Sequence, residues 1–241
     1  MSNNPTISLS IVSHGQGGLI ANLLHDLLSF EMSDVEIVLT INIPEPLDFL
    51  VPYSNLRLQV IENTVPLGFG ANHNQAFQSS RGRFFCVVNP DIRLPNDSFK
   101  ALPQFFDKRT GACAPLVTAS DGEIQDSARR FPTFGRLFAR AILRQREPDY
   151  LFERKPVSVD WLAGMFIAFR REAFEDVAGF NDRYFMYMED ADLGRRLRRR
   201  GWEVHLIPTI QVIHDAQRAS RRDLRHLRWH LRSVIRYLVG I

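Results

Sequence analysis

The residues of this sequence best suited to chemistry are an aspartate, a pair of carboxylates and a histidine, each next to an apolar run. The aspartate is Asp91 in Asn89-Pro90-Asp91, the pair is Glu189-Asp190, and the histidine is His214. Carboxylate and imidazole groups are ligands for divalent cations, and a carboxylate can also take a proton from a hydroxyl group. These residues therefore suggest a cation site and a general base.

Asp91 comes shortly after residues 84–88, a continuous apolar run typical of a strand covered on both faces. A side chain at the end of such a strand faces the ligand crevice of an open α/β sheet. A lone aspartate there can hold Mg²⁺ or Mn²⁺, which keep several waters and take further oxygens from a substrate diphosphate. The alternative is that Asn-Pro-Asp forms only a turn, which the tripeptide by itself favours.

The three acids in residues 189–192 have two explanations. Acidic residues in the first turn of a helix interact favourably with its dipole, which is a purely structural role. The preceding residues 184–188 are large and mostly apolar, however, and a carboxylate that emerges from such a wall loses hydration. Lost hydration raises its pKa toward the range useful to a general base. The local pattern leaves both explanations open, and a role for His214 depends on whether Asp91 lies nearby.

The elements that position these residues follow from the hydrophobic periodicity. Strand-like runs cover residues 7–12, 35–43, 56–61, 84–88, 159–169 and 202–207, and the fifth is broken at Gly164. Helical patterns cover residues 19–30, 70–80, 95–106 and 189–200. Strands that alternate with helices predict an α/β fold with a mostly parallel central sheet flanked by helices. Residues 118–155 have few periodic features and are expected to form a variable excursion.

The loop after the first strand argues against a nicotinamide-dinucleotide site. Its sequence is His14-Gly15-Gln16-Gly17-Gly18, and Ile20 stands where the dinucleotide motif needs its third small residue. The acid that binds the ribose is also missing, because Asn42 lies at the end of the second strand. An oxidoreductase is therefore not expected.

The composition is that of an ordinary globular protein of 241 residues, with 45% hydrophobic and 24% charged residues, which excludes a disordered chain. Only two cysteines are present, both in apolar runs, so we expect reduced thiols and a cytoplasmic chain. We expect neither a signal peptide nor a membrane span. Residues 1–5 lack a basic and apolar leader pattern, and no apolar run reaches the roughly 18–20 residues that cross a bilayer.

Positive charge gathers in residues 218–241, where seven arginines against one aspartate give a formal charge of +6. The whole chain carries +3, which leaves −3 for residues 1–217 and makes nucleic-acid binding through this body unexpected.

The same segment is predicted to form an amphipathic helix. Its arginines lie beside an apolar stripe made of Leu224, Leu227, Leu231, Ile235 and Leu238. Such a helix either packs on the body or lies on an anionic membrane surface. In the second case the side chains expected in the interface are those of Leu224, Leu227, Leu231 and Trp229.

A series of short motifs runs in order through residues 7–215. The motifs are Leu9-Ser-Ile-Val-Ser-His-Gly15, Asn63 with Leu67-Gly-Phe-Gly-Ala-Asn-His-Asn74, Val88-Asn-Pro-Asp91, Asp160-Trp161 with Gly164, Arg170-Arg-Glu-Ala-Phe174, Gly179-Phe-Asn-Asp182, Phe185-Met-Tyr-Met-Glu-Asp-Ala-Asp-Leu193, Gly201-Trp202, Pro208 and Val212-Ile-His214. Each motif is weak alone, but the ordered set resembles the family 2 glycosyltransferases, in their bacterial rhamnosyltransferase-like branch.

This resemblance implies a GT-A fold in residues 1–217, with a nucleotide-sugar-binding half at 1–117, an acceptor and catalytic half at 118–217, and the amphipathic helix at 218–241. Asp91 matches the last aspartate of the family's metal-binding motif, and His214 matches a second metal ligand. Asp190 matches the catalytic base. The positions matched to substrate binding are Ser13, Asn42, Asn72, Asn89, Trp161, Gly164 and Glu189.

Two positions depart from the family pattern. Asn42 stands where the family usually has an aspartate that contacts the base or ribose, so the nucleobase preference stays open. Asp215 follows His214 where relatives often have His or Gly, which leaves the metal shell open.

The implied function is that of an inverting glycosyltransferase dependent on Mg²⁺ or Mn²⁺. It would move a sugar, with rhamnose a candidate, from a dTDP- or UDP-linked donor to a hydroxyl of a glycan or polyprenyl-linked saccharide in cell-surface polysaccharide synthesis. The expected location is the cytoplasm or the inner face of the cell membrane. The alternative is a non-catalytic nucleotide-sugar-binding or membrane scaffold protein, against which the presence of Asp91, Asp190 and His214 argues.

Overall fold

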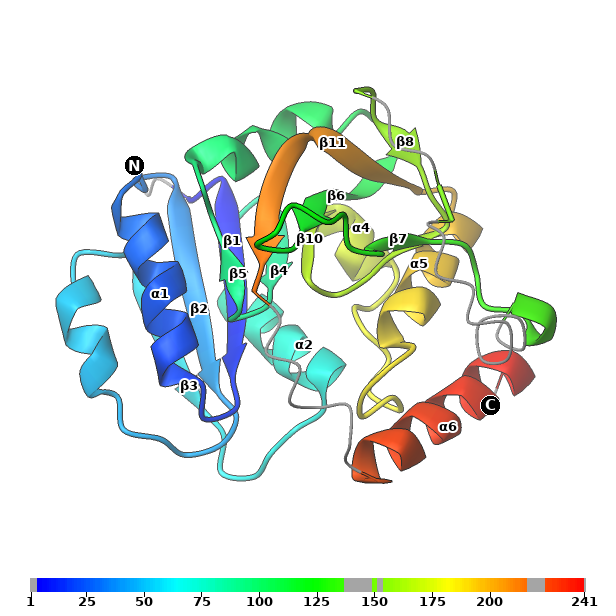
Figure 1. Cartoon of the computed structure of the whole chain (residues 1–241), viewed down its shortest axis with the longest axis horizontal. Coiled ribbons are helices and arrows are strands. Elements are labelled where there is room, and N and C mark those ends of the chain that lie inside the picture. The colour runs from blue at the N-terminus through cyan, green and yellow to red at the C-terminus, as the bar shows by residue number, and fades with distance from the viewer. Residues whose placement is uncertain (1–3, 137–148, 151–153, 216–223, 241) are drawn as a thin grey trace.

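The computed structural model describes residues 4–136, 149–150, 154–215 and 224–240. Within them a nine-stranded sheet forms the centre of the molecule (Figure 1). Eight strands lie in the order β3 (Leu58–Glu62), β2 (Val35–Ile41), β1 (Ile7–Ser13), β4 (Phe84–Val88), β10 (Phe166–Arg170), β6 (Thr110–Thr118), β11 (Glu203–His214) and β5 (Ile92–Arg93), and β8 (Val157–Ser158) also pairs with β11.

The sheet is mostly parallel, as the sequence predicts. The pairs β1–β2, β1–β4, β2–β3 and β6–β11 are parallel, whereas β10 runs antiparallel to both of its neighbours, β4 and β6. Because β4 and β6 both run antiparallel to β10, they are parallel to each other. The strands β1, β4, β6 and β11 therefore all point the same way. Their carboxyl ends therefore meet at one edge of the sheet, where ligands bind in open α/β folds.

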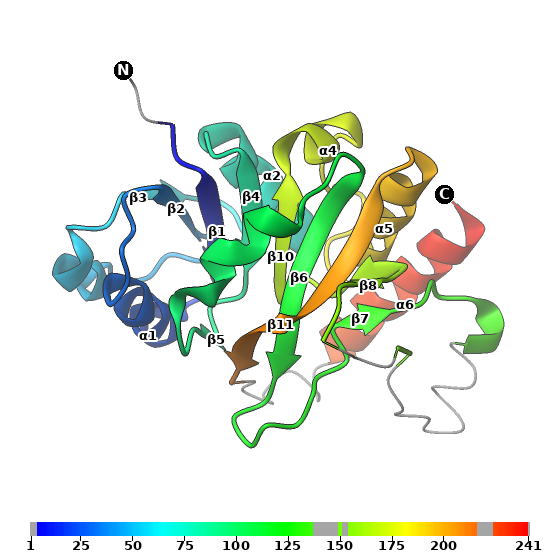
Figure 2. The same cartoon turned by 90° about the horizontal axis from the view of Figure 1, so that it is seen from above.

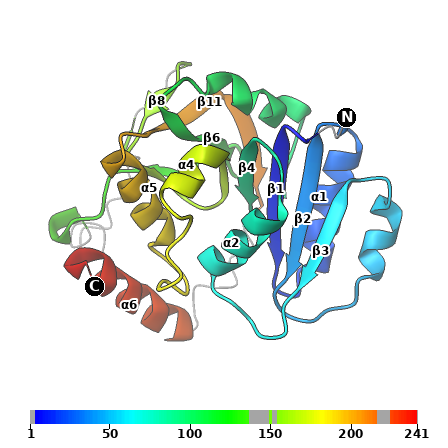
Figure 3. The same ribbon diagram turned by 180° about the vertical axis from the view of Figure 1, so that it is seen from behind.

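Helices cover both faces of this sheet (Figures 2 and 3). α1 (Gly17–Leu28) lies on one face and α2 (Phe69–Ser79) on the other. The sequence of β4 is apolar throughout because both faces of the strand are buried. Phe84, Cys86 and Val88 belong to the core under α1, and Phe85 and Val87 belong to the core on the opposite face. Both cysteines of the chain are buried free thiols.

The remaining elements complete the two layers. The face of α2 also carries α4 (Arg171–Asp176) and α5 (Glu189–Arg199), and the face of α1 carries the 3₁₀ helix η2 (Asp97–Phe105). A second 3₁₀ helix, η1 (Asp48–Tyr53), packs near α1, and β7 (Ala128–Arg129) pairs with β9 (Trp161–Leu162) in a two-stranded ribbon. α6 (Leu224–Val239) lies at the end of the described chain beside the loop that precedes α5 (Figure 1).

Three details differ from the sequence predictions. The helix at 95–106 is a 3₁₀ helix rather than an α-helix, and it contains Pro103, which lacks an N–H and cannot sit comfortably inside an α-helix. The strand predicted at 202–207 continues to His214 through an irregularity between Ile207 and Gln211. The nine-residue strand β6 was not predicted at all. Residues 137–148 and 151–153 of the predicted excursion, and residues 216–223 of the tail, lie outside the described residues.

In the described part of the chain, no helix combines the length and the apolar character that crossing a membrane requires.

Candidate active site

A pocket of about 370 Å³ opens at the carboxyl edge of the sheet. It lies between the ends of β1 and β4, the start of α2, the first turn of α5 and one residue of α6. Five residues of the predicted site line this pocket: Asn89, Asp91, Gly164, Glu189 and Asp190. A second hollow of about 650 Å³ lies beside α1 and β5, and it contains none of the predicted site residues.

His214 and Asp91 form a pair at this edge, which the sequence analysis required for a role of the histidine. Nε2 of His214 lies 3.1 Å from Oδ2 of Asp91. The pairing of β5 with the end of β11 puts Ile92 opposite His214 and so brings the neighbouring Asp91 to the histidine. Oε1 of Gln125 lies 2.6 Å from Nδ1 of His214. As an acceptor this oxygen receives a hydrogen bond from Nδ1, so Nε2 is the ring nitrogen that faces Asp91.

The donor atoms of this pair fit a hard divalent cation. Oδ1 of Asp91 is buried and has no hydrogen-bond partner among the described residues, so an acceptor atom is left over for a ligand. No cluster of three or more acidic, histidine or cysteine side chains suited to a metal ion occurs in the described residues. A cation held by Asp91 and His214 would therefore take its other ligands from water or from a diphosphate, as Mg²⁺ and Mn²⁺ commonly do.

Glu189 and Asp190 are the first two residues of α5, and both line the pocket. The two residues before them, Tyr187 and Met188, have left-handed backbone angles, with φ of +70° and +68°. Such angles cost energy in residues other than glycine and tend to occur where a functional site needs a particular turn. Here the left-handed residues Tyr187 and Met188 lead directly into the first helical turn of α5, whose residues Glu189 and Asp190 line the pocket.

The two carboxyl groups differ in their environments. Burial raises the pKa of Glu189 to about 8, and the adjacent charge of Asp190 adds to this effect. Burial also raises the pKa of Asp190, but its charged form accepts hydrogen bonds from Ala191 N–H to Oδ1 (2.8 Å) and from Gly164 N–H to Oδ2 (3.2 Å). Glu189, with a pKa of about 8, is mostly protonated at pH 7, whereas the two hydrogen bonds favour the charged form of Asp190.

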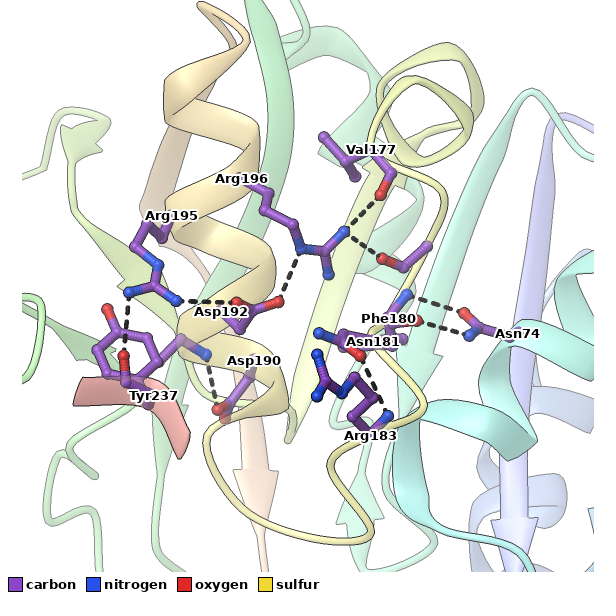
Figure 4. Close-up of polar contacts among 12 residues, drawn as sticks. Asn74, Val177, Phe180, Asn181, Arg183, Asp190, Asp192, Arg195, Arg196 and Tyr237 are labelled. Atoms are coloured by element: carbon purple, nitrogen blue, oxygen red, sulfur yellow. Dashed lines mark hydrogen bonds and ion pairs between the residues drawn. The ribbon is translucent and has the colours of Figure 1, made fainter. Parts of the chain in front are cut away.

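The third acid of the segment, Asp192, has a structural role (Figure 4). Its carboxylate accepts from Arg195 at 3.1 Å and from Arg196 at 2.7 Å. Arg196 also donates to the carbonyl oxygens of Gly179 and Val177. The helix that carries Asp190 is thus tied to the loop that leads into it.

A second tie joins this loop to α2. The side chain of Asn74 donates to the carbonyl oxygen of Phe180 (2.8 Å) and accepts from its N–H (2.9 Å), as Figure 4 shows. Nearby, Phe69 N–H donates to the carbonyl oxygen of Phe185 (2.9 Å), and Gly68 lies so close that an added Cβ would sit 2.5 Å from that oxygen. The glycine in the Leu-Gly-Phe-Gly motif therefore permits two loops to touch beside the pocket.

The residues predicted to hold the nucleoside lie deeper than the pocket wall. Asn42 is buried, and its side chain bonds the backbone of Leu67 at both ends (2.8 and 3.0 Å) and accepts from Asn63 (2.8 Å). Asn72 is also buried and accepts from the same Asn63 (2.7 Å). Ser13 is buried and donates to Glu45, which also accepts from Gly17 N–H (2.9 Å). These contacts fix the loops around the pocket.

Comparison with known proteins agrees with this geometry. The sequence pattern described as "Glycosyltransferase like family 2" matches residues 5–231, nearly the whole chain. The chain belongs to this family.

Two curated relatives of this family 2 chain are named rhamnosyltransferases. The N-acetylglucosaminyl-diphospho-decaprenol L-rhamnosyltransferase of Mycobacterium tuberculosis is 38% identical over 164 residues, which are 63% of this chain. The match spans only 53% of that protein's length, about half of it. Rhamnosyltransferase WbbL of Escherichia coli is 30% identical over 96% of this chain and 92% of its own.

Among solved structures, GalNAc-T7 with UDP, GalNAc and Mn²⁺ superposes with a TM-score of 0.73. The match covers 98% of this chain and 48% of that chain, at 15% identity. The family 2 chain therefore has the GT-A fold, as the resemblance implied.

Trp161 does not line the pocket. Its ring is buried behind α5 against Tyr184, Ala191 and Tyr237, and its Nε1–H donates to the carbonyl oxygen of Arg130 (3.0 Å). In this structure it supports the helix that bears Asp190.

Among the residues that contact the site, Glu45, Gln125 and His226 were not predicted. Gln125 falls in the stretch without periodicity, and His226 belongs to the tail. Neither pattern contains a signal that would have placed these side chains at the pocket.

Proposed function

We propose that this chain transfers a sugar from a nucleoside-diphosphate sugar to a hydroxyl group of a lipid-linked saccharide, with a divalent cation and with inversion. The observation that carries the proposal is the arrangement of the pocket. Asp91, which pairs with His214, and Asp190 line the same cavity, one shortly after the end of β4 and the other in the first turn of α5. Asp91 comes from residues 1–117, whereas His214 and Asp190 come from residues 118–217.

The donor diphosphate belongs at the Asp91 end. Asp91 and His214 would hold Mg²⁺ or Mn²⁺, and the bound cation would neutralise charge on the departing diphosphate. The proton that Gln125 holds on Nδ1 of His214 keeps Nε2 available as a ligand atom.

Asp190 is suited to take the proton of the acceptor hydroxyl. The backbone N–H groups of Gly164 and Ala191 hold its carboxylate in one orientation, and burial raises its pKa toward that of a useful base. A double displacement would need a second, charged carboxylate as the nucleophile, and Glu189 beside Asp190 is a poor candidate for that role. Glu189 has its pKa raised to about 8 by burial and is mostly protonated at pH 7. A single displacement with inversion is the step that fits one charged carboxylate.

The names of the relatives support the choice of substrates. Two of them are rhamnosyltransferases, and the name of the Mycobacterium protein specifies a diphospho-decaprenol acceptor. We therefore propose rhamnose as the sugar, a dTDP- or UDP-linked donor, and a polyprenyl-linked saccharide as the acceptor.

Thermal unfolding with UDP, dTDP and GDP, each with and without Mn²⁺, tests the donor end first. A ligand at a hundred times its dissociation constant stabilises the folded state by about 2.7 kcal/mol. Stabilisation by UDP or dTDP that requires Mn²⁺ supports the proposal, and no stabilisation by any nucleotide contradicts it.

Turnover is tested next with dTDP-rhamnose and UDP-sugars on an N-acetylglucosaminyl-diphospho-prenol acceptor. The proton at the anomeric carbon of the product, read by NMR, distinguishes inversion from retention. Metal-dependent nucleotide binding without any transfer in this assay would favour the non-catalytic scaffold alternative.

A further inference from the structure

The helix α6 is attached to the active site by one of its faces. The ring of Trp229 lies 4.8 Å from that of Phe185, Ser233 donates to the carbonyl oxygen of Met186 (2.8 Å), and the hydroxyl of Tyr187 lies 2.8 Å from Nδ1 of His226. These contacts hold the loop that leads into α5. Trp229 was expected in the interface in the case that the helix lies on a membrane; its ring instead packs against Phe185.

The opposite face of α6 is apolar and exposed. Leu227, Leu231, Ile235 and Val239 follow at intervals of four residues and expose between 51% and 65% of their surface. We call these four residues the outer stripe. The side chain of Leu224 is not among those that the structure describes. A contiguous exposed apolar surface of this kind is typical of a site that binds another protein or a membrane.

The charges of α6 indicate what it binds. Arg228 and Arg232 are exposed and lie next to the outer stripe, since they precede Leu231 and Ile235 by three residues in the helix. The sequence from Leu224 to Val239 contains four arginines and no acidic residue. An apolar stripe beside a purely basic one fits the boundary between headgroups and acyl chains of an anionic bilayer.

The spacing of the outer stripe argues against a second copy of the chain as its occupant. Helices that pair in a coiled coil repeat apolar residues at alternating intervals of three and four. The outer stripe uses intervals of four only, so it winds around the helix and offers no straight seam to a partner helix.

We propose that the outer stripe and the adjoining arginines bind a bilayer that contains anionic phospholipid, and so set the pocket mouth at the membrane surface. The same helix contributes His226 to the wall of the pocket, and Figure 3 shows it beside the loop that leads into α5. The advantage of a pocket mouth at the membrane rests on the proposed function: a polyprenyl-linked acceptor would then reach Asp190 from the bilayer. The binding itself does not depend on that function.

Flotation with vesicles tests the binding without donor or acceptor. We compare phosphatidylcholine vesicles with vesicles that also contain phosphatidylglycerol. The variant Leu227→Gln/Leu231→Gln keeps helix-forming residues and should bind the mixed vesicles about tenfold or more weakly. Val51→Gln/Val65→Gln is the matched control, because these two valines are as exposed but lie far along the chain from α6. The control should bind like the unchanged chain.

The role of charge is tested by Arg228→Gln/Arg232→Gln, which should lose most of the preference for phosphatidylglycerol. Equal flotation of the unchanged chain and the leucine variant would overturn the proposal. So would light scattering that shows a dimer in the unchanged chain and a monomer in the leucine variant, because the stripe would then bind a second copy. If flotation behaves as expected while no nucleotide binds, the proposed function fails and the lipid surface stands.

Discussion

Nε2 of His214 lies 3.1 Å from Oδ2 of Asp91, and no third ligand of the usual kinds joins them in the described residues. A site with two protein ligands is incomplete for Mg²⁺ or Mn²⁺, which prefer six oxygen or nitrogen ligands. Under the proposed function the diphosphate of the donor would therefore help to hold the cation, and we expect cation and nucleotide to bind together rather than independently.

Asp91→Asn should weaken this coupled binding. The amide keeps the size of the side chain but lacks the charge that a divalent cation needs, so we expect the affinity for the nucleotide in Mn²⁺ to fall about tenfold or more. Without Mn²⁺ the variant and the unchanged chain should bind alike. Isothermal titration of UDP or dTDP measures both values. Glu172→Gln, an exposed carboxylate on α4, is the control, and equal affinities of all three proteins in Mn²⁺ would remove Asp91 from the cation site.

Asp190→Asn should lower kcat by roughly a hundredfold or more, because the amide cannot take the hydroxyl proton. Nucleotide affinity should change little, since the proposed cation ligands, Asp91 and His214, are unchanged. The amide oxygen can still accept from Gly164 N–H, but Ala191 N–H would then face the amide NH2 and lose its acceptor, so some stability should be lost as well. Initial rates and nucleotide titrations on the same preparation separate the two effects. An undiminished kcat would exclude Asp190 as the base.

Asp192→Asn should have the contrasting result. Asp192 is 5% exposed and balances two arginines, so the substitution leaves their charges without a counterion in a partly buried place. We expect the free energy of unfolding to fall by about 3 kcal/mol. The remaining folded protein should still turn over substrate, because the base is intact. Urea denaturation gives the stability, and a loss of kcat as large as that of Asp190→Asn would contradict this separation of roles.

Several of the residues at this site could be predicted because they are local consequences of the chain. Phe84–Val88 is apolar at every position because both faces of β4 are covered, and this places the residues after it at the carboxyl edge. Asp190 follows an apolar segment, and its raised pKa has the cause that the segment suggested. What brings His214 to Asp91 is the pairing of β5 with β11, which is non-local.

The positions of other side chains depend on tertiary packing, which the hydrophobic periodicity of the sequence does not predict. Asn42 and Asn72 belong to one hydrogen-bonded group with Asn63, because their three side chains face each other between loops. Trp161 was expected in the pocket and instead supports α5 from behind. Its large apolar ring is more stable when buried, and only the tertiary structure decides on which side of the helix it is buried.

Glu189→Gln should stabilise the fold in a pH-dependent way. An unfolded glutamate ionises near its ordinary pKa of 4.5, whereas the pKa of Glu189 in the folded chain is about 8. Between these values the folded state binds more protons than the unfolded state, so its stability falls as the pH rises. The amide does not titrate. We expect Tm of the variant to match that of the unchanged chain near pH 4.5 and to exceed it at pH 8, by about 2–4 °C for each kcal/mol that the ionisation of Glu189 costs the folded state.

Thermal unfolding of both proteins at pH 5, 6.5 and 8 provides this comparison. Glu172→Gln, which removes an exposed carboxylate, should give no such trend. A difference in Tm that stayed constant across the three pH values would mean that Glu189 is charged in the folded chain.

Gly68→Ala should disturb the contact between the two loops beside the pocket. The added Cβ would lie 2.5 Å from the carbonyl oxygen of Phe185 and 2.8 Å from its Cα, and both are backbone atoms that cannot turn away. We expect a loss of about 1–3 kcal/mol in the free energy of unfolding. Because Phe185 lies in the loop that leads to Asp190, kcat should fall as well. Gly18→Ala in α1 is the matched control, since nothing lies within 4 Å of its added Cβ. That change should leave kcat alone and stabilise the helix by roughly 0.5–1 kcal/mol, so equal stabilities of the two variants would show that the loops need no close approach.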